Sequence, residues 1–174
     1  MSTGKLSSAP LLMALLLFAG GTAFAGPDLG REAGPEEVAA WDITIAPDGR
    51  GLPPGGGTAA EGGAVYQARC AGCHGVKGTE GPADRLVGGI GTLASKKPVK
   101  TVGSYWPYAT TLFDYIRRAM PYNAPRSLSN DQVYALSAYL LFLNGIIGPE
   151  TRMDAKTLPR ITMPNRGGFV GYWP

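Results

Sequence analysis

The sequence has few of the side chains that usually bind metals or form disulfides: two cysteines and one histidine among 174 residues. A structural zinc site takes four ligands from pairs of cysteines and histidines, and the chain has no second pair to complete one. Both cysteines lie in one short motif, so neither is left for a disulfide elsewhere. A nucleic-acid-binding module is not indicated, because Lys96, Lys97 and Lys100 form only a small basic cluster.

Long apolar segments are also scarce. The run Leu11–Phe18 is shorter than the roughly 20 residues that a membrane helix needs, and no later stretch approaches that length. This run follows Lys5 and precedes Ala23-Phe24-Ala25, a pattern typical of a secretory signal peptide cleaved before Gly26. We therefore expect residues 1–25 to be removed and the mature chain to be periplasmic, without a membrane span.

Turn-forming residues are abundant, with 26 glycines and 15 prolines, so much of the chain is expected to be coil. We predict an extended Pro/Gly-rich leader over 26–57, one domain over 58–148 and an irregular C-terminal tail over 149–174. Charge follows this division. Residues 26–61 hold seven acidic and two basic side chains, whereas residues 62–174 hold six acidic and thirteen basic ones. Such a basic domain either is simply solvated or steers an acidic partner to its surface.

Helix signals are confined to the central domain. Capping boxes at Thr58–Glu61 and Ser129–Gln132 each predict a helix start, and a cap signature at Thr111–Asp114 predicts another helix that Pro121 must end. The last helix has the strongest apolar stripe, and we expect it to cross the first. The prediction is an all-α domain; the stripe consists of Val133, Leu136, Leu140 and Leu143, with Tyr139 beside it.

The run Cys70-Ala71-Gly72-Cys73-His74 is the most informative feature of the chain. Two cysteines at this spacing can form thioethers to the two vinyl groups of one porphyrin, and the next residue can then ligate its iron. A thioredoxin-like dithiol is the main alternative, but it does not require a histidine directly after the second cysteine. We therefore predict one covalently attached c-type haem, held by Cys70 and Cys73, with His74 as an axial ligand.

The sixth iron ligand cannot be a second histidine of this chain, because there is none. Methionine is the leading candidate, and Met120 has the best position, in a loop between two predicted helices that can fold over the haem. Met163, a water molecule or a lysine remain as alternatives. Ordinary core packing is the competing explanation for any methionine.

Residues around the haem can also be proposed. The imidazole of His74 needs an acceptor for its second nitrogen, and the backbone carbonyl of Pro82 is our candidate. Further side chains are candidates for hydrogen bonds to the haem propionates, with plain packing as the alternative for the aromatic ones. These are Tyr105, Trp106, Tyr108, Arg85 and Arg118.

These residues together resemble class I cytochrome c, whose fold is a small helical bundle around one haem with histidine and methionine ligands. The resemblance covers roughly Thr58 to Gly145 and rests on Gly62, Tyr66, the Cys70–His74 motif, Pro82, Met120-Pro121 and Tyr139. A longer stretch is similar to the cytochrome subunits of sulfur and sulfite dehydrogenases, of the SoxD-like and SorB-like kinds. It comprises Lys100–Pro121, Asn123-Ala124-Pro125, Ser127-Leu128, Pro47-Asp48-Gly49, Gly51-Leu52-Pro53 and Met163-Pro164-Asn165-Arg166.

The resemblance implies a haem subunit that takes electrons from a periplasmic molybdenum-cofactor dehydrogenase and passes them to an acceptor cytochrome. The molybdenum chemistry would belong to the partner, so this chain would not itself be an enzyme. A generic periplasmic electron shuttle for another dehydrogenase is the alternative. A haem enzyme with an open iron position is less favoured, because no second histidine is available as a distal acid or base.

Overall fold

The computed structural model describes residues 30–171, so the expected signal peptide lies outside the described residues. The chain divides into a short N-terminal unit, of which residues 30–39 are described, and a larger unit from Ala40 onward. In the described residues, no helix is long and apolar enough to cross a membrane.

The leader is not extended throughout, because it contains helix α1 (Pro35–Trp41). Proline at a first helical position has a suitable φ and lacks only an amide that would be unpaired there. Glu36 and Glu37 follow in the first turn, where negative charge favours a helix. Glu37 also forms an ion pair with Arg31 at 2.5 Å, which lowers the pKa of its carboxyl group.

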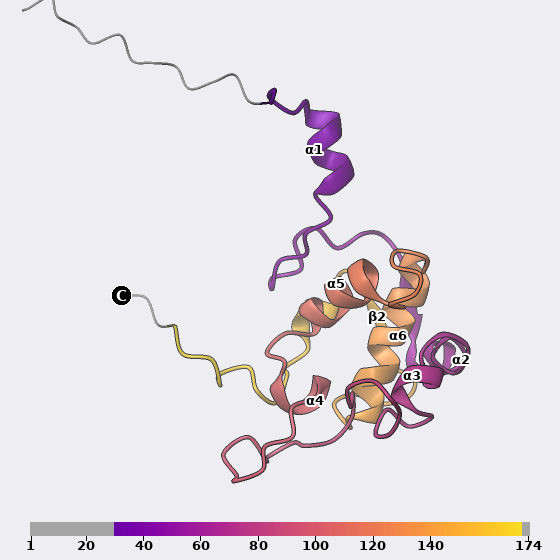
Figure 1. Ribbon diagram of the computed structural model, residues 1–174, viewed down its shortest axis with the longest axis vertical. Helices are drawn as coiled ribbons and strands as arrows, with labels where there is room; N and C mark the ends of the chain where they lie inside the picture. The colour runs from indigo at the N-terminus through magenta and orange to yellow at the C-terminus, as the bar shows by residue number, and fades with distance from the viewer. Residues whose placement is uncertain (1–29, 172–174) are drawn as a thin grey trace, which may run out of the picture. The chain divides into compact units, whose positions relative to one another are not determined.

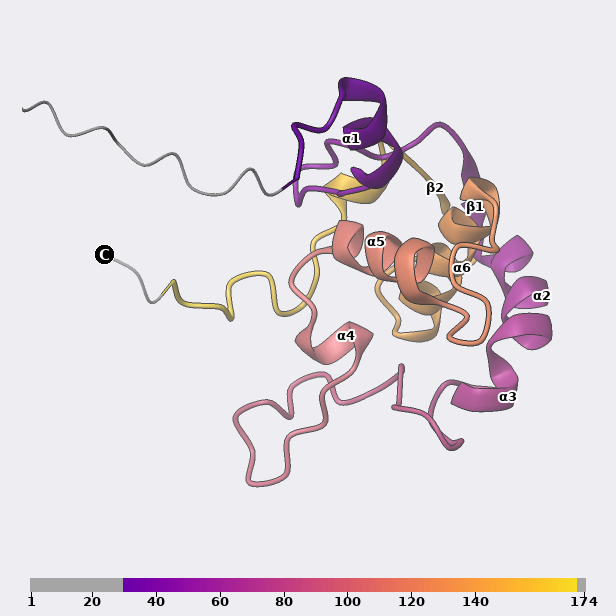
Figure 2. The same ribbon diagram turned by 45° about the horizontal axis from the view of Figure 1, so that its top comes forward.

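Two capping boxes form as predicted and begin the two helices that cross. Helix α2 (Ala59–Arg69) is capped by Thr58, whose hydroxyl accepts from the amide of Glu61, and helix α6 (Asn130–Leu143) is capped by Ser129 in the same way. The apolar stripe of α6 is buried from Val133 to Leu140. Figures 1 and 2 show α6 between α2 and helix α5 (Ala109–Ala119), and α6 contacts both of them.

Helix α5 starts at Ala109, whereas a cap at Thr111 predicted a start three residues later, at Leu112. Its N-cap is Tyr108, which makes no side-chain capping bond, so packing rather than a cap fixes this start. Ala109, Leu112, Phe113 and Ile116 are buried on one side of the helix. The short helix α4 (Val102–Tyr105) precedes it, with a capping box formed by Thr101 and Ser104.

The C-terminal segment is more ordered than the irregular tail expected from its prolines and glycines. Strand β2 (Arg152–Asp154) pairs antiparallel with β1 (Gly56–Thr58), so that Gly57 lies opposite Met153. A 3-10 helix, η1 (Leu158–Arg160), follows. Met153, Leu158 and Met163 are each at most 1% exposed and belong to the hydrophobic core. These three apolar residues are spaced too irregularly to reveal a helix or strand period, which is why the sequence pattern missed them.

Candidate functional site

One turn of helix brings both thiols and the imidazole together. Helix α3 comprises Ala71–His74, and Cys70 is its N-cap directly after α2. The amides of Cys73 and His74 both donate to the carbonyl of Cys70, at 3.1 and 3.0 Å. The motif therefore starts at the end of α2, the helix that packs on α6.

The imidazole of His74 is fixed by a hydrogen bond to the backbone. Its Nδ1 lies 2.8 Å from the carbonyl oxygen of Asp84. Since a carbonyl can only accept, Nδ1 must carry a proton, and in the neutral ring Nε2 then keeps its lone pair. This is the tautomer that a metal-ligating histidine needs, with the ring held in a set orientation.

The acceptor is Asp84 rather than Pro82, so our expectation was two residues too early. The loop after α3 turns back on the motif, because the amide of Ala83 donates to the carbonyl of Cys73 at 2.9 Å. Gly81 makes this turn with φ of 125°, and a Cβ atom there would lie 2.4 Å from the carbonyl oxygen of Cys73. The loop is thus already bonded to the motif at residue 83, and the next carbonyl along the chain reaches the imidazole.

The two cysteines are free thiols with different surroundings. Cys70 is half-buried, and Cys73 is exposed. Burial raises the pKa of the Cys70 thiol to about 11, so this group is protonated at neutral pH. Neither thiol has a disulfide partner among the described residues, and both remain available for thioether bonds.

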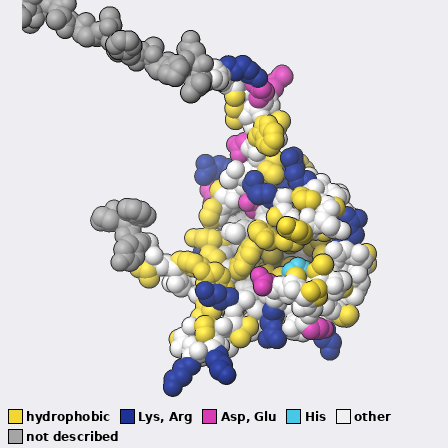
Figure 3. Space-filling view, in the orientation of Figure 1, with side chains coloured by type: hydrophobic (Ala, Val, Ile, Leu, Met, Phe, Trp, Pro, Cys, Tyr) yellow, Lys and Arg dark blue, Asp and Glu magenta, His cyan; other side chains and the backbone are white. Residues whose placement is uncertain are grey.

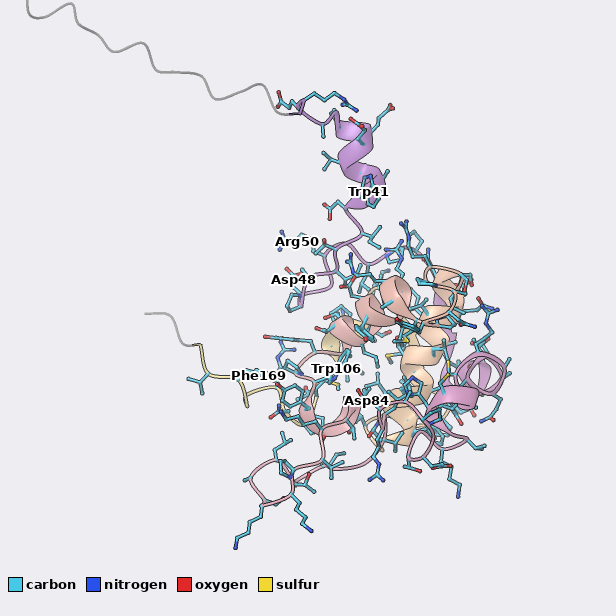
Figure 4. The ribbon with its side chains drawn as sticks, in the orientation of Figure 1. Trp41, Asp48, Arg50, Asp84, Trp106 and Phe169 are labelled. Carbon is cyan, nitrogen blue, oxygen red and sulfur yellow. The ribbon has the colours of Figure 1, made fainter. Side chains whose placement is uncertain are left out.

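Figure 3 shows the single histidine in a hollowed part of the surface with hydrophobic side chains around it. Figure 4 labels Asp84 and Trp106 at this part of the molecule, between α4, α5 and the loop that follows α3. Tyr105, Trp106 and Tyr108 are all half-buried, and the Trp106 ring meets Tyr115 of α5 edge-on at 5.6 Å. An apolar hollow beside a fixed imidazole suits a large, flat, mainly hydrophobic group.

The three methionines beyond the expected signal peptide differ in burial. Met120 is the C-cap of α5, has the extended backbone expected before a proline, and lies half-buried against the edge of the core. Met153 and Met163 are both 1% exposed inside the core. Met120 therefore remains our candidate for the sixth ligand.

The two arginines expected near the propionates already have protein partners. Arg118 forms an ion pair with Asp114 at 2.9 Å on the surface of α5, and the Nε of Arg85 donates to the carbonyl of Thr79 at 3.2 Å. Both side chains are exposed. Their role at the haem stays a prediction.

Sequence reasoning missed Asn144, which supports the loop that carries Asp84. Its side chain is 8% exposed at the end of α6. The amide nitrogen donates to the carbonyl of Leu86 at 3.2 Å, and the oxygen accepts from the amide of Gly88 at 3.1 Å. An Asn-Gly pair after a helix is an ordinary helix end, so nothing in the pattern showed this second role.

Comparison with known proteins agrees with this geometry. The sequence model of the family "Cytochrome c" matches residues 59–144. A chain of the crystal structure of the sulfane dehydrogenase SoxCD from Paracoccus pantotrophus is 43% identical, with a TM-score of 0.77. That alignment covers 83% of this chain and 71% of the other. The comparison with curated proteins found no significant match.

The chain therefore belongs to the cytochrome c family, with the class I fold, and it is similar to the SoxD-like and SorB-like group. Its donor set fits the one covalent c-type haem that this family carries: two free thiols, an imidazole in the ligating tautomer and an apolar hollow. When bound, the haem supplies a one-electron couple at its iron. The protein is an electron-transfer haem protein.

Proposed function

We propose that this cytochrome is a periplasmic electron-transfer subunit that accepts electrons from a molybdenum-cofactor dehydrogenase acting on sulfite or another reduced sulfur compound. It then passes them to an acceptor cytochrome. Cys70 and Cys73 would hold the haem, and His74 and Met120 would ligate its iron. The chain performs no bond-making step of its own, and the oxidation of sulfur takes place on the partner.

The observation that carries the proposal is the extent of the similarity to the SoxCD chain. The family model matches only residues 59–144, whereas the likeness at 43% identity covers 83% of the sequence. It therefore extends beyond the residues that any cytochrome c needs to hold its haem. A free shuttle would have no need to keep such flanking segments, whereas a subunit that contacts a particular dehydrogenase would.

The ligand set supports the electron-transfer role of the site. A histidine and a methionine would together supply both protein ligands to the iron, and the thioether would favour ferrous iron relative to two nitrogen ligands. With both ligands from the protein, the iron would have no free position for a substrate. The loop between α3 and α4 supports contact with an acidic partner, because residues 75–101 hold five basic side chains and two acidic ones. Lys96 and Lys97 are exposed in the loop between α3 and α4.

The test is to purify the tagged, haem-loaded chain from its native host under mild conditions. We expect molybdenum to elute with it in a fixed ratio to haem, and the haem to be reduced when sulfite or thiosulfate is added. A Cys70→Ser, Cys73→Ser double variant serves as the control without covalent haem. It should still retain the partner if the flanking segments make the contact, but it should give no spectral change.

Two other results would point elsewhere. A monomer that elutes without molybdenum, and that many unrelated donors reduce equally fast, would identify a generic shuttle. Tight binding of carbon monoxide to the isolated reduced protein, or of peroxide to the oxidised protein, would show an open iron position and support an enzyme.

A further inference from the structure

Three residues close to the C-terminus contact the same short segment at the haem site. The Nδ2 of Asn165 donates to the carbonyl of Tyr105 at 2.7 Å, the shortest contact of the group. The guanidinium carbon of Arg166 lies 4.3 Å from the ring centroid of Tyr108, and the Phe169 ring meets Tyr105 edge-on at 5.2 Å. We call Asn165, Arg166 and Phe169 the C-terminal clamp.

The clamp is itself anchored in the core. Met163, two residues before Asn165, is 1% exposed. Two turns follow, in which the amide of Arg166 donates to the carbonyl of Met163 at 3.0 Å and that of Gly168 to the carbonyl of Asn165 at 3.1 Å. The Asn165 side chain fills the space beside Gly168 so closely that a Cβ atom at Gly168 would lie 1.8 Å from its Oδ1. The orientation of the amide group thus depends on Gly168.

A short series of hydrogen bonds joins the clamped segment to the imidazole. Asp84 accepts from His74, and two residues later the carbonyl of Leu86 accepts from the amide of Val102 at 3.3 Å. Val102 begins helix α4, and Tyr105 ends it. One end of α4 is therefore bonded to the loop that orients the iron ligand, and the other end is bonded to Asn165.

We propose that Asn165 is a positioning residue for the haem: through the C-terminal clamp it holds Tyr105–Tyr108 beside the hollow at His74 and raises the reduction potential of the iron. Ferric haem carries one more positive charge than ferrous haem, and water stabilises charge better than an apolar wall. Burial and outer hydrogen bonds are among the means by which a protein sets a haem potential. Releasing the segment admits water and favours the ferric state.

The test uses the full-length, haem-loaded protein with three single variants. Asn165→Leu removes the amide donor without adding charge, and Gly168→Ala displaces the same amide by steric contact. Gly167→Ala is the matched control, because a Cβ atom there has no neighbour within 4 Å. The reduction potential is measured by spectroelectrochemical titration, and thermal unfolding is followed on the same samples.

We expect a lower potential in Asn165→Leu and Gly168→Ala, and the parent potential in Gly167→Ala. Both substitutions break the same hydrogen bond, the one from Asn165 to Tyr105. The Asn165→Leu, Gly168→Ala double variant should therefore shift the potential no further than the larger of the two single shifts. An unchanged potential together with lower thermal stability would overturn the proposal and leave the clamp a purely structural role. Additive shifts in the double variant would also count against it, because the two residues would then act separately.

Discussion

Gly62 of α2 packs directly on Ala135 of α6: a Cβ atom at Gly62 would lie 2.0 Å from the carbonyl oxygen of Ala135. The two helices therefore cross with their backbones in contact. One turn further along, the rings of Tyr66 and Tyr139 lie 5.2 Å apart across the same crossing. Because α2 leads directly into Cys70, this contact sets where the haem motif stands relative to the core.

The first prediction tests this crossing with two neighbouring glycines. Gly62→Ala should destabilise the folded protein by about 1 to 3 kcal/mol, the usual cost of overpacking, because rigid backbone faces the new methyl group. Gly63→Ala is the control. Its Cβ would meet only the ring of half-buried Tyr139, at 3.3 Å, and alanine favours a helix by about 0.5 to 1 kcal/mol over glycine. Urea unfolding measures both; equal losses would show that the close approach does not matter.

The second prediction concerns the sixth ligand. Met120→Leu should abolish the sulfur-to-iron charge-transfer band at the red end of the oxidised spectrum and lower the reduction potential. Met163→Leu is the control, because it makes the same substitution at another methionine, and it should retain the band. Since Met163 is buried in the core and leucine has a similar volume, we expect a stability loss below about 1.5 kcal/mol. The opposite pattern, with the band lost only in Met163→Leu, would move the ligand to the C-terminal segment.

The third prediction tests the support that Asn144 gives to the loop carrying Asp84. Asn144→Ala leaves the carbonyl of Leu86 and the amide of Gly88 without these partners, and we expect a loss of about 2 kcal/mol or more in the free energy of unfolding. Asn123→Ala, at an exposed loop position, should change stability by less than about 0.5 kcal/mol. If the two variants have the same free energy of unfolding, the hydrogen bonds of Asn144 make no net contribution to stability.

Local signals predicted the helical part of this fold well. The capping boxes at Thr58 and Ser129 each combine two side chains within four residues, so they can be read without knowing the tertiary structure. The stripe of α6 is equally local. Helix α5 was placed three residues late because its start at Ala109 depends on packing, which no short pattern records.

The candidate site likewise has a part that a local motif predicts and a part that depends on the tertiary fold. Covalent haem attachment could be predicted from the Cys70–His74 motif alone, because both thiols and the imidazole lie within five consecutive residues. The acceptor for His74 depends on how a glycine-rich loop turns, and a difference of two residues there changes the partner from Pro82 to Asp84. The contact between Asn165 and Tyr105 spans 60 residues, and only the folded chain brings that pair together.

The last prediction follows from two buried tyrosines. Tyr66 donates to the carbonyl of Gly75 at 2.9 Å and Tyr134 to that of Pro53 at 2.8 Å, and burial raises the pKa of each to about 12 from an ordinary value of 10. Between about pH 10 and pH 12 the unfolded chain loses these protons while the folded protein keeps them. The unfolded state then binds fewer protons, so stability is complete below about pH 10 and falls as the pH rises further.

Tyr134→Phe should therefore cost about 1 kcal/mol at neutral pH, through the lost hydrogen bond, and should also flatten the alkaline fall in stability. The measurement is the urea midpoint of the haem-loaded protein at several pH values from about 8 to about 12. Tyr122→Phe, whose ring is 86% exposed, is the control and should keep the parent slope. If Tyr134→Phe lost stability with pH as steeply as the parent, the phenol of Tyr134 would have the same pKa in the folded and unfolded states. Burial would then not raise that pKa.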